Sequence, residues 1–487
     1  PDRGQEHVAR LGLTREGAIT AIETSFTRDH GAYLPLGEVI PRNTINHLPG
    51  PYRVPALQTT ATNVVTHTVF CGAYRGSGRP EAAFVMERLL DRAARQLKLD
   101  PAEIRRRNLI RPHEMPYRTG LVYRDGTPVQ YDPADYPAAF ERLLEAFEYA
   151  TWRRRQAEAR YGARPIGIGL AAYVQGTGVG PFEGADVRVD GGGNVHVFIG
   201  VSSQGQAHET TMAQIAASEL GVDPERVTVV AADTATLPFG NGTGGSRVAA
   251  NAGPAVARSS REVAARARRV AAELLECAPE DIVLAAGRAQ VAGVPARAVG
   301  LGDLARAALK SKSLAREGTP GLQACGYFAP ESVTFAFGAQ CCAVEVDTET
   351  GAVRLLRWVA AHDCGRPINP MVVEGQLHGG VAQGIGTALS EALLFDPEGQ
   401  LLSGSFMDYG LPFAADLPPI ETLILAYPST RNDLGIKGVG ESGIIAPPAA
   451  LANAVEDALV DRGAECSRIP LTAARVWEAL RDTRRAG

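Results

Sequence analysis

The chain has 487 residues, 45% of them hydrophobic and 21% charged, an ordinary balance for a soluble globular protein of roughly two to four domains. The net charge of -5 gives no basic surface, which excludes nucleic acid as an expected partner. Seven scattered cysteines without C-x-x-C spacing fit reduced thiols in the cytoplasm and exclude an iron–sulfur cluster held by this chain. No apolar run approaches the roughly 18 residues of a membrane span, so no membrane contact is expected.

The first third of the chain combines strands with one long helix. Alternating apolar residues predict strands at residues 18–29 and 61–70. Apolar residues at positions 85–97 then keep helical spacing, and Pro80 suits the first turn of that helix.

A polar, Pro-containing stretch at residues 153–165 predicts a domain boundary. We therefore expect two domains, residues 1–163 and 164–487. Two hairpins follow in the second of them, at residues 184–200 with a turn at 190–194, and at residues 331–362 with a turn at 348–351.

One arrangement recurs five times, a Gly-rich loop that leads into a helix. The loops, in chain order, are AYRGSGRP (73–80), VSSQGQ (201–206), GNGTGGSR (240–247), DCGRPINP (363–370) and KGVGESGIIAPP (437–448). The predicted fold is α+β, with mixed sheets covered by helices and Gly-rich loops at the helix N-termini.

These loops have two interpretations. A helix N-terminus offers unpaired N–H groups and a positive dipole end, which suits an anion. Several such loops with polar donors could enclose an extended anionic ligand such as a pyrophosphate-bearing cofactor, and the donors are Arg75, Gln204, Gln206, Ser246 and Arg247. Ordinary glycine turns explain the loops equally well, so both interpretations stay open.

The last loop contains G-x-G-x-x-G at Gly438, Gly440 and Gly443, the spacing of the dinucleotide fingerprint. A true nicotinamide loop follows a buried hydrophobic strand. Here the polar, turn-rich residues 426–437 precede it, and a second match at residues 240–245 fails on the same context. The context therefore argues against a nicotinamide site.

Glu441 stands in this loop between Gly440 and Ser442. A carboxylate in a tight, partly dry pocket has a raised pKa and can act as a base near neutral pH. The plainer interpretation is a Glu that stabilises a helix dipole, and taken alone that one is favoured. The nine histidines lack metal-ligand spacing, so no protein-held metal is predicted, and the glycines 375, 379 and 386 of one helix predict close packing.

Seven motifs together resemble one family. AYRGSGRPEA, QGQAHETT, GTGGSR, DCGRPINP, GQLHGGVAQGIG, SFMDYGLP and KGVGESG occur in the order of the molybdenum-binding large subunit of xanthine dehydrogenases, aldehyde oxidases and aerobic carbon monoxide dehydrogenases. The resemblance runs to about residue 465 and implies two molybdopterin-binding domains, the first represented by its C-terminal part. It implies a molybdopterin cofactor, in prokaryotic relatives usually the cytosine dinucleotide form, whose dithiolene holds the molybdenum. Iron–sulfur and FAD subunits are the implied partners.

The resemblance also assigns residues. Glu441 falls on the family's catalytic glutamate, a general base for hydroxylating an aldehyde or N-heterocycle with oxygen from water. Gln206 falls near the metal's apical position, Arg75 and Gly76 on the loop over the metal, and Ser246 and Arg247 on a dinucleotide contact. The full set expected to bind the cofactor is Arg75, Gly76, Gln204, Gly205, Gln206, Gly245, Ser246, Arg247, Gly438 and Gly440.

Three departures from the family pattern leave alternatives open. Gly76 stands where carbon monoxide dehydrogenase has a copper-binding Cys, and Ser77 where xanthine enzymes have a substrate-stacking Phe. The chain lacks an initiating Met and the family's N-terminal domain with its GGFG-type loop, so we expect a fragment, or a split subunit that another chain completes. The alternatives are a form II carbon monoxide dehydrogenase-like subunit of unknown substrate and a non-catalytic paralogue.

Overall fold

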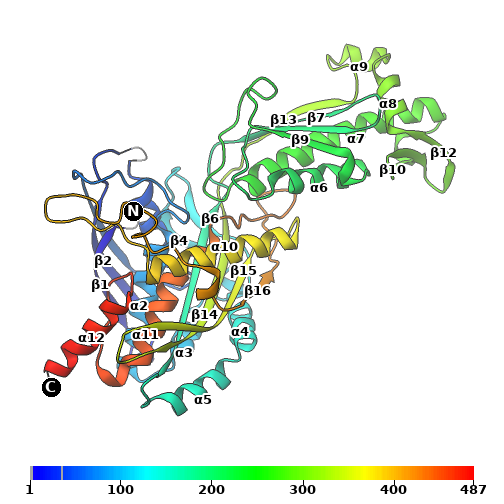
Figure 1. Ribbon diagram of the computed structural model, residues 1–487. Helices are drawn as coiled ribbons and strands as arrows, with labels where there is room; N and C mark the ends of the chain where they lie inside the picture. Colours follow the sequence, from blue (N-terminus) through cyan, green and yellow to red (C-terminus); the bar gives the residue numbers. More distant parts are fainter. Residues whose placement is uncertain (1–3, 35–36, 487) are drawn as a thin grey trace.

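The computed structural model describes residues 4–34 and 37–486 as two lobes (Figure 1). The smaller lobe, drawn in green at the upper right, is one continuous insertion of residues 183–328. It is inserted between two long strands of the larger lobe, β6 (Ile166–Thr177) and β14 (Thr334–Val346), which pair antiparallel along their length. The two strands therefore carry the chain into the smaller lobe and back.

The larger lobe is built on two mixed sheets. The first has the order β1-β2-β3 and the second β16-β15-β14-β6, and each contains one parallel pair, β2–β3 and β15–β16. The remaining strands are β1 (Gln5–Leu13), β2 (Ile19–Asp29), β3 (Leu57–Val64), β15 (Val353–Asp363), β16 (Ile420–Leu425) and the hairpin β4 (Tyr117–Val122) with β5 (Pro128–Tyr131). The helices are α1 (Val39–His47), α2 (Arg79–Leu97), α3 (Pro101–Asn108), α4 (Tyr136–Phe147), α5 (Tyr149–Ala159), α10 (Pro370–Leu389), α11 (Pro447–Leu459) and α12 (Ala473–Ala486).

The smaller lobe has its own hydrophobic core between a four-stranded sheet and helices. The sheet order is β13-β7-β8-β9, with β8 and β9 parallel. Its elements are β7 (Glu183–Val189), β8 (Val195–Ile199), β9 (Val227–Ala231), β13 (Gln323–Phe328), the sheet β10 (Ile282–Ala285), β11 (Arg288–Val291) and β12 (Val294–Gly300), and helices α6 (His208–Leu220), α7 (Gly253–Leu275), α8 (Leu301–Ala308) and α9 (Lys312–Arg316). The predicted α+β class, with mixed sheets covered by helices, is confirmed.

Local predictions held where the apolar pattern was long. The strand at 18–29, the helix after Pro80 and both hairpins are present. The strand expected at 61–70 ends at Val64, because the following residues fold back on the turn at Gly31 through a hydrogen bond from Thr66 N to Gly31 O (3.1 Å). The presumed boundary stretch is helical through Ala159, since its Arg, Gln, Glu and Ala residues are good helix formers.

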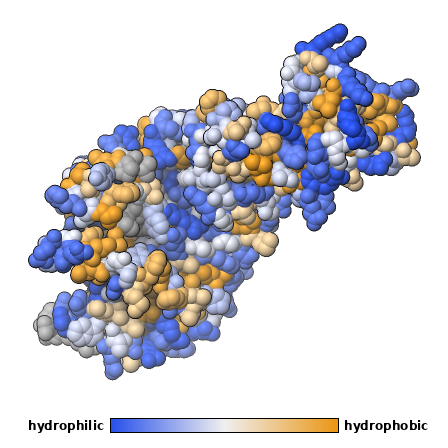
Figure 2. Space-filling view, turned by 45° about the horizontal axis from the view of Figure 1, so that its top comes forward, coloured by the Kyte–Doolittle hydropathy of each residue, from blue (hydrophilic) through white to orange (hydrophobic). Residues whose placement is uncertain are grey.

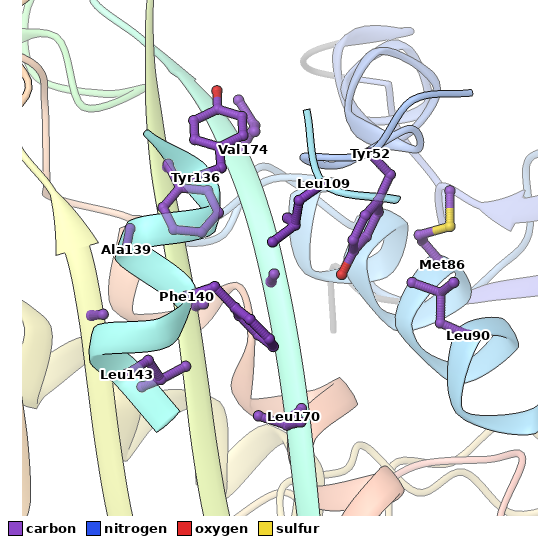
Figure 3. Packing of buried hydrophobic residues seen from close by; sticks show 14 of the residues in the cluster. Tyr52, Met86, Leu90, Leu109, Tyr136, Ala139, Phe140, Leu143, Leu170 and Val174 are labelled. Atoms are coloured by element: carbon purple, nitrogen blue, oxygen red, sulfur yellow. The ribbon is translucent and has the colours of Figure 1, made fainter. Parts of the chain in front are cut away.

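The hydrophobic core of the larger lobe contains residues from both sides of the predicted boundary at 153–165 (Figure 3). Tyr136 and Phe140 of α4 pack beside Leu170 and Val174 of β6, and Tyr52 and Leu109 from the first hundred or so residues belong to the same cluster. The ring of Tyr136 stacks on Phe337 of β14 at 4.5 Å between centroids. The first 163 residues therefore share a core with the sheet that follows them.

Helix α11 lies directly on β6 because two glycines of the strand leave room for it. A Cβ added to Gly167 or Gly169 would lie 1.8 Å from a backbone oxygen of α11, that of Ala454 or Ala450. Ser442–Arg462, which includes α11, is long and apolar enough to cross a membrane, and 89% of its apolar window is buried in the protein. This run corrects the expectation that the chain has none, and burial on this scale is that of a core helix.

Replacing Gly169 by Ala is expected to lower the free energy of unfolding by about 1–3 kcal/mol or more, because the methyl group forces α11 off the sheet. Urea denaturation followed by circular dichroism measures the change. Gly4→Ala is the matched control, since no atom lies within 4 Å of its added Cβ. Equal stability of the two variants would contradict the packing argument.

Candidate functional site

A cavity of about 490 Å³ lies where the smaller lobe joins the larger one, and all five Gly-rich loops line it. The contributing segments are residues 73–75, 204–206, 243–247, 366–369 and 436–441. As predicted, each loop leads into a helix, namely α2, α6, α7, α10 or α11. The interpretation as unrelated glycine turns does not account for this convergence.

Three helix N-terminal regions border the cavity. His208 begins α6, Val248 begins the turn that leads into α7, and Asn369 caps α10 by accepting a hydrogen bond from Val372 N at 3.3 Å. Arg366 also lines the cavity, is exposed, and pairs with no side chain in residues 4–34 or 37–486. Unpaired N–H groups and a free guanidinium together favour an anionic ligand.

Some glycines of the cavity wall leave the backbone uncovered by side chains. A Cβ added to Gly205, Gly244 or Gly375 would have no neighbour within 4 Å, so each glycine leaves space in front of its backbone. The side chains of Gln204 and Gln206 lie beside Gly205 and hydrogen-bond each other at 3.2 Å. The helix N-termini, the Arg366 guanidinium, the glutamine amides and the uncovered backbone suit an extended anionic molecule that hydrogen-bonds to amide groups, such as a pterin with a diphosphate.

Glu441 is the carboxylate at the cavity wall, with a side chain 13% exposed. Its Oε1 accepts from Gly76 N at 3.1 Å, and its Oε2 accepts from Ser246 Oγ at 3.1 Å. The guanidinium of Arg79 lies 3.5 Å from Oε2 and is itself 1% exposed. The carboxylate is therefore held in one orientation from three directions.

Arg75 connects its own loop to the Glu441 loop and to helix α10. It donates from Nε to Gly440 O at 2.6 Å, and from Nη2 to Gln376 O of α10 at 3.0 Å. Burial lowers the pKa of Arg75, while the nearby Glu441 raises it. Arg75 thus fixes the Glu441 loop against α10 at the edge of the cavity.

The glycines of the G-x-G-x-x-G match serve the protein's own backbone. A Cβ on Gly438 would lie 1.9 Å from Ser246 O, and one on Gly443 would lie 2.6 Å from Leu377 O of α10. Gly440 has only ordinary contacts with Ser246 and borders the cavity. Close packing of backbone therefore requires glycine at Gly438 and Gly443, while the binding of a cofactor by Gly438 and Gly440, which both border the cavity, stays a prediction.

Of the three glycines predicted to permit close packing along α10, only one does so. Gly386 does so, because its Cβ would lie 2.8 Å from Pro412 Cδ. Gly375 and Gly379 instead line the cavity, and the close contacts of α10 are made by Gly380 against Gly443 and by Gly384 against Pro447. The prediction was wrong for the two cavity glycines, because a sequence does not show which face of a buried helix meets a neighbour.

All residues predicted to bind a cofactor line the cavity except Gly76, whose N–H is used by Glu441. Arg247 is 4% exposed, and its guanidinium binds Glu183 and the carbonyls of Val179, Phe182 and Gly242, so it anchors the loop. The N–H of Gly438 is likewise occupied by Thr177 Oγ1 at 2.9 Å. Within the described chain no cluster of three His, Cys, Asp or Glu side chains could hold a metal ion.

Two residues beside Glu441 were missed. Gln175 is fully buried in β6 and donates from Nε2 to Ser246 Oγ at 2.8 Å and to Glu441 Oε2 at 3.4 Å. A single Gln within an otherwise apolar strand was the available signal. Arg79 stands in the first turn of α2, where the helix dipole disfavours a cation, and that conflict could have indicated a buried anion nearby.

A third missed feature is an ion pair beneath the Glu441 loop. Lys437 Nζ lies 2.5 Å from Asp363 Oδ2 at the end of β15, and both side chains are 0% exposed. Asp363 also accepts from the backbone N–H groups of Gly365 and Tyr427 at 2.9 and 3.0 Å. Two Gly-rich loops are thereby joined at their bases.

Comparison with known proteins identifies the family. Residues 2–109 and 142–418 match two models of a molybdopterin cofactor-binding domain. The chain is 36% identical over 487 residues to 6-hydroxypseudooxynicotine dehydrogenase complex subunit gamma of Paenarthrobacter nicotinovorans, covering 99% of this chain and 61% of the relative. It is 35% identical to the carbon monoxide dehydrogenase large chain of Hydrogenophaga pseudoflava, covering 97% and 60%. The crystal structure of quinoline 2-oxidoreductase from Pseudomonas putida 86 superposes with a TM-score of 0.89 at 36% identity, covering 98% and 62%.

The chain thus spans about three fifths of the length of these relatives. Both family models carry the same description, and the larger match alone covers more than half of the chain. The resemblance drawn from the seven motifs is confirmed. The chain belongs to the molybdopterin cofactor-binding family, among the molybdenum-binding large subunits related to carbon monoxide and xanthine dehydrogenases.

Proposed function

We propose that this chain is the catalytic part of a molybdenum hydroxylase, in which Glu441 is the general base. The observation that carries the proposal is a single carboxylate, oriented by Gly76, Ser246 and Arg79, at the wall of a cavity enclosed by five Gly-rich loops. When bound, the molybdopterin cofactor supplies two-electron oxidation of a carbon centre with oxygen from water. The carboxylate of Glu441 takes up the proton that the attacking water-derived oxygen releases.

The other predicted residues have distinct proposed roles. Gln204, Gly205 and Gln206, with Gly245 and Gly440, would contact the cofactor directly, whereas Gly76, Ser246 and Arg75 would position Glu441. Arg247 and Gly438 would hold the loops in place. Arg366 at the start of α10 is a further candidate for the anionic part of the cofactor, proposed as the cytosine dinucleotide form.

The proposed substrate class is an aldehyde or an N-heterocycle. The matched relatives include nicotine 6-hydroxylase large subunit and quinoline 2-oxidoreductase, whose names describe N-heterocycles. The second candidate is a carbon monoxide dehydrogenase-like activity, favoured by similarity to that large chain. Gly76, in place of a copper-binding Cys, argues against it.

We propose iron–sulfur and FAD subunits as partners, a cytoplasmic location, and the domain division at residues 1–163 and 164–487. Relatives named as a complex subunit or a large chain support an assembly. Figure 2 shows hydrophobic side chains on the surface of the larger lobe. Phe406, Met407 and Phe413 of one loop are 73–93% exposed, as is typical of surfaces that bind another polypeptide.

Cofactor analysis tests this proposal. Protein purified with its neighbouring subunits, from a host that makes the cofactor, is expected to contain molybdenum and acid-released cytidine monophosphate in equimolar amounts. Inductively coupled plasma mass spectrometry and chromatography measure the two. A chain loaded with neither, in a host where a control molybdenum hydroxylase is fully loaded, would contradict the cofactor assignment and favour the non-catalytic paralogue.

A further inference from the structure

Arg79 is a buried cation in the first turn of α2, beside the Glu441 loop, and its side chain is 1% exposed. Its guanidinium donates to two backbone oxygens, from Nη1 to Gly76 O at 3.1 Å and from Nη2 to Gly176 O at 2.8 Å. Nη2 also donates to the hydroxyl oxygen of Tyr123 at 3.4 Å. These neutral acceptors hold the guanidinium in place whether or not Glu441 is charged.

A further neighbour of Arg79, His47 of α1, is a neutral imidazole. Its Nδ1 lies 2.7 Å from Asn43 O, and because a carbonyl oxygen can only accept, Nδ1 carries the proton. Its Nε2 accepts from Arg79 Nε at 3.3 Å and from Gly176 N at 3.0 Å. Burial lowers the pKa of His47 well below its ordinary value, and the charge of Arg79 adds to that shift. His47 therefore orients Arg79 without balancing its charge.

Within residues 4–34 and 37–486, Glu441 is the only carboxylate within 4.0 Å of the Arg79 guanidinium. Its Oε2 lies 3.5 Å from Arg79 Nη1. Burial lowers the pKa of Arg75 and of Arg124, and Glu441 opposes that shift in both, so these two cations also lie within its electrostatic reach. In the same ranges neither of them comes within 4.0 Å of the Glu441 carboxylate, so Arg79 is its contacting cation.

The other charged groups of the cavity leave this pair to itself. Glu441 is the only acidic side chain among the described residues that line the cavity. The lining cations Arg247 and Lys437 each pair with a buried carboxylate of their own, and Arg366 is exposed to solvent. Burial lowers the pKa of the lining His208. The negative charge that Arg79 needs is therefore supplied by the cavity carboxylate itself.

The charge of this ion pair is fixed on one side only. Arginine keeps its positive charge at every ordinary pH, so the pair is balanced only while Glu441 is a carboxylate. Proton uptake by Glu441 would leave Arg79 as an uncompensated buried charge, which costs free energy. An opposite charge at this distance favours the charged form of a carboxyl group.

We infer that Arg79 is a positioning residue that holds Glu441 in the charged form, in which the carboxylate can take up a proton. That this charge serves a general base rests on the proposed function of Glu441. The charge balance itself does not, because it is built from α1, α2 and the Glu441 loop without any cofactor.

Carbodiimide labelling tests the charge of Glu441, because the reagent labels a carboxyl group in proportion to its protonated fraction. The full chain, without its cofactor, is treated at about pH 6, and mass spectrometry of its peptides gives the labelling rate of Glu441 relative to that of Glu374. Glu374 is exposed on α10 outside the cavity and serves as the internal reference.

In Arg79→Gln the relative labelling rate of Glu441 is expected to rise at least about 10-fold over wild type, the smaller end of what an opposite charge within about 4–6 Å contributes. Arg79→Lys keeps the positive charge but not the planar fork, and should label at the wild-type rate. The two variants therefore separate the charge of Arg79 from its geometry. Arg79→Met replaces Arg79→Gln in this comparison if circular dichroism shows that Arg79→Gln does not fold.

The inference is overturned if Glu441 labels at the wild-type rate in the uncharged variant. It is also overturned if Arg79→Lys labels as fast as that variant, because the shape of the guanidinium and not its charge would then control Glu441. The proposed function fails independently, through absence of molybdenum and nucleotide. A labelling rate that depends on the charge of Arg79 in a chain that never holds the cofactor would keep the ion pair and remove the hydroxylase assignment.

Discussion

Glu441→Gln is expected to lower kcat of the loaded enzyme by at least about 100-fold, the smaller end of what general-base catalysis contributes. Gln has nearly the volume of Glu and keeps one of the two accepting oxygens, so that it can still accept from Gly76 N or from Ser246 Oγ. The fold and the cofactor content should therefore stay at wild-type level while the base is lost. Steady-state kinetics and molybdenum analysis on the same preparation separate the two effects.

Glu374→Gln is the control for this change. Glu374 lies on the exposed side of α10, outside the cavity, and its removal should leave kcat unchanged. If Glu441→Gln and Glu374→Gln turn over equally well, another group is the base and the proposed mechanism is wrong. If molybdenum is lost together with activity, Glu441 acts in holding the loops rather than in the reaction.

Lys437→Met is expected to lower the free energy of unfolding by about 3–5 kcal/mol, because it leaves the buried carboxylate of Asp363 without its cation. Burial raises the pKa of Asp363 and Lys437 opposes that shift, so the carboxyl of the variant would favour its neutral form. Denaturant unfolding of the chain without cofactor at neutral pH measures the loss.

Two further variants test whether the buried charge causes the loss of stability. Adding Asp363→Asn to Lys437→Met should recover part of the stability, since no uncompensated charge is then buried. Breaking the exposed Arg10–Glu23 pair by Arg10→Ala should cost less than about 1 kcal/mol, because its side chains are 77% and 54% exposed. A double variant no more stable than Lys437→Met would show that packing of the lysine stem, and not its charge, stabilises the loop.

Much of the fold could be predicted because its signals are local. Helix α10 has an apolar residue every fourth position, and the turn at Asp190–Asn194 closes through hydrogen bonds among its own residues. The shared core of α4 and β6 could not be predicted, because the polar residues of α5 between them follow the surface and resemble a linker. Apolar periodicity shows that a face is buried, but not against what.

The residues of the site could likewise be predicted only in part. Arg75, Gln206 and Glu441 belong to motifs with unusual local composition, and the structure brings their loops to one cavity. Gln175 lies inside a regular strand and Arg79 inside a regular helix. The only unusual feature was the residue type, a polar side chain in an apolar strand and a cation in the first turn of a helix. Their importance comes from a contact with a residue more than 260 positions away, and no pattern within one element encodes such a contact.

The same distances determine when the site can form. The hydrogen bond from Arg75 to Gly440 closes a loop of 365 residues, and the cavity needs segments as far apart in sequence as Ala73 and Glu441. Contacts this remote in sequence are made late in folding, after local elements have formed. A cofactor that binds there can select only the finished chain, and by binding it adds its own free energy to the folded state. Insertion of the cofactor would then act as the last check on folding, with the unloaded chain the form most exposed to unfolding.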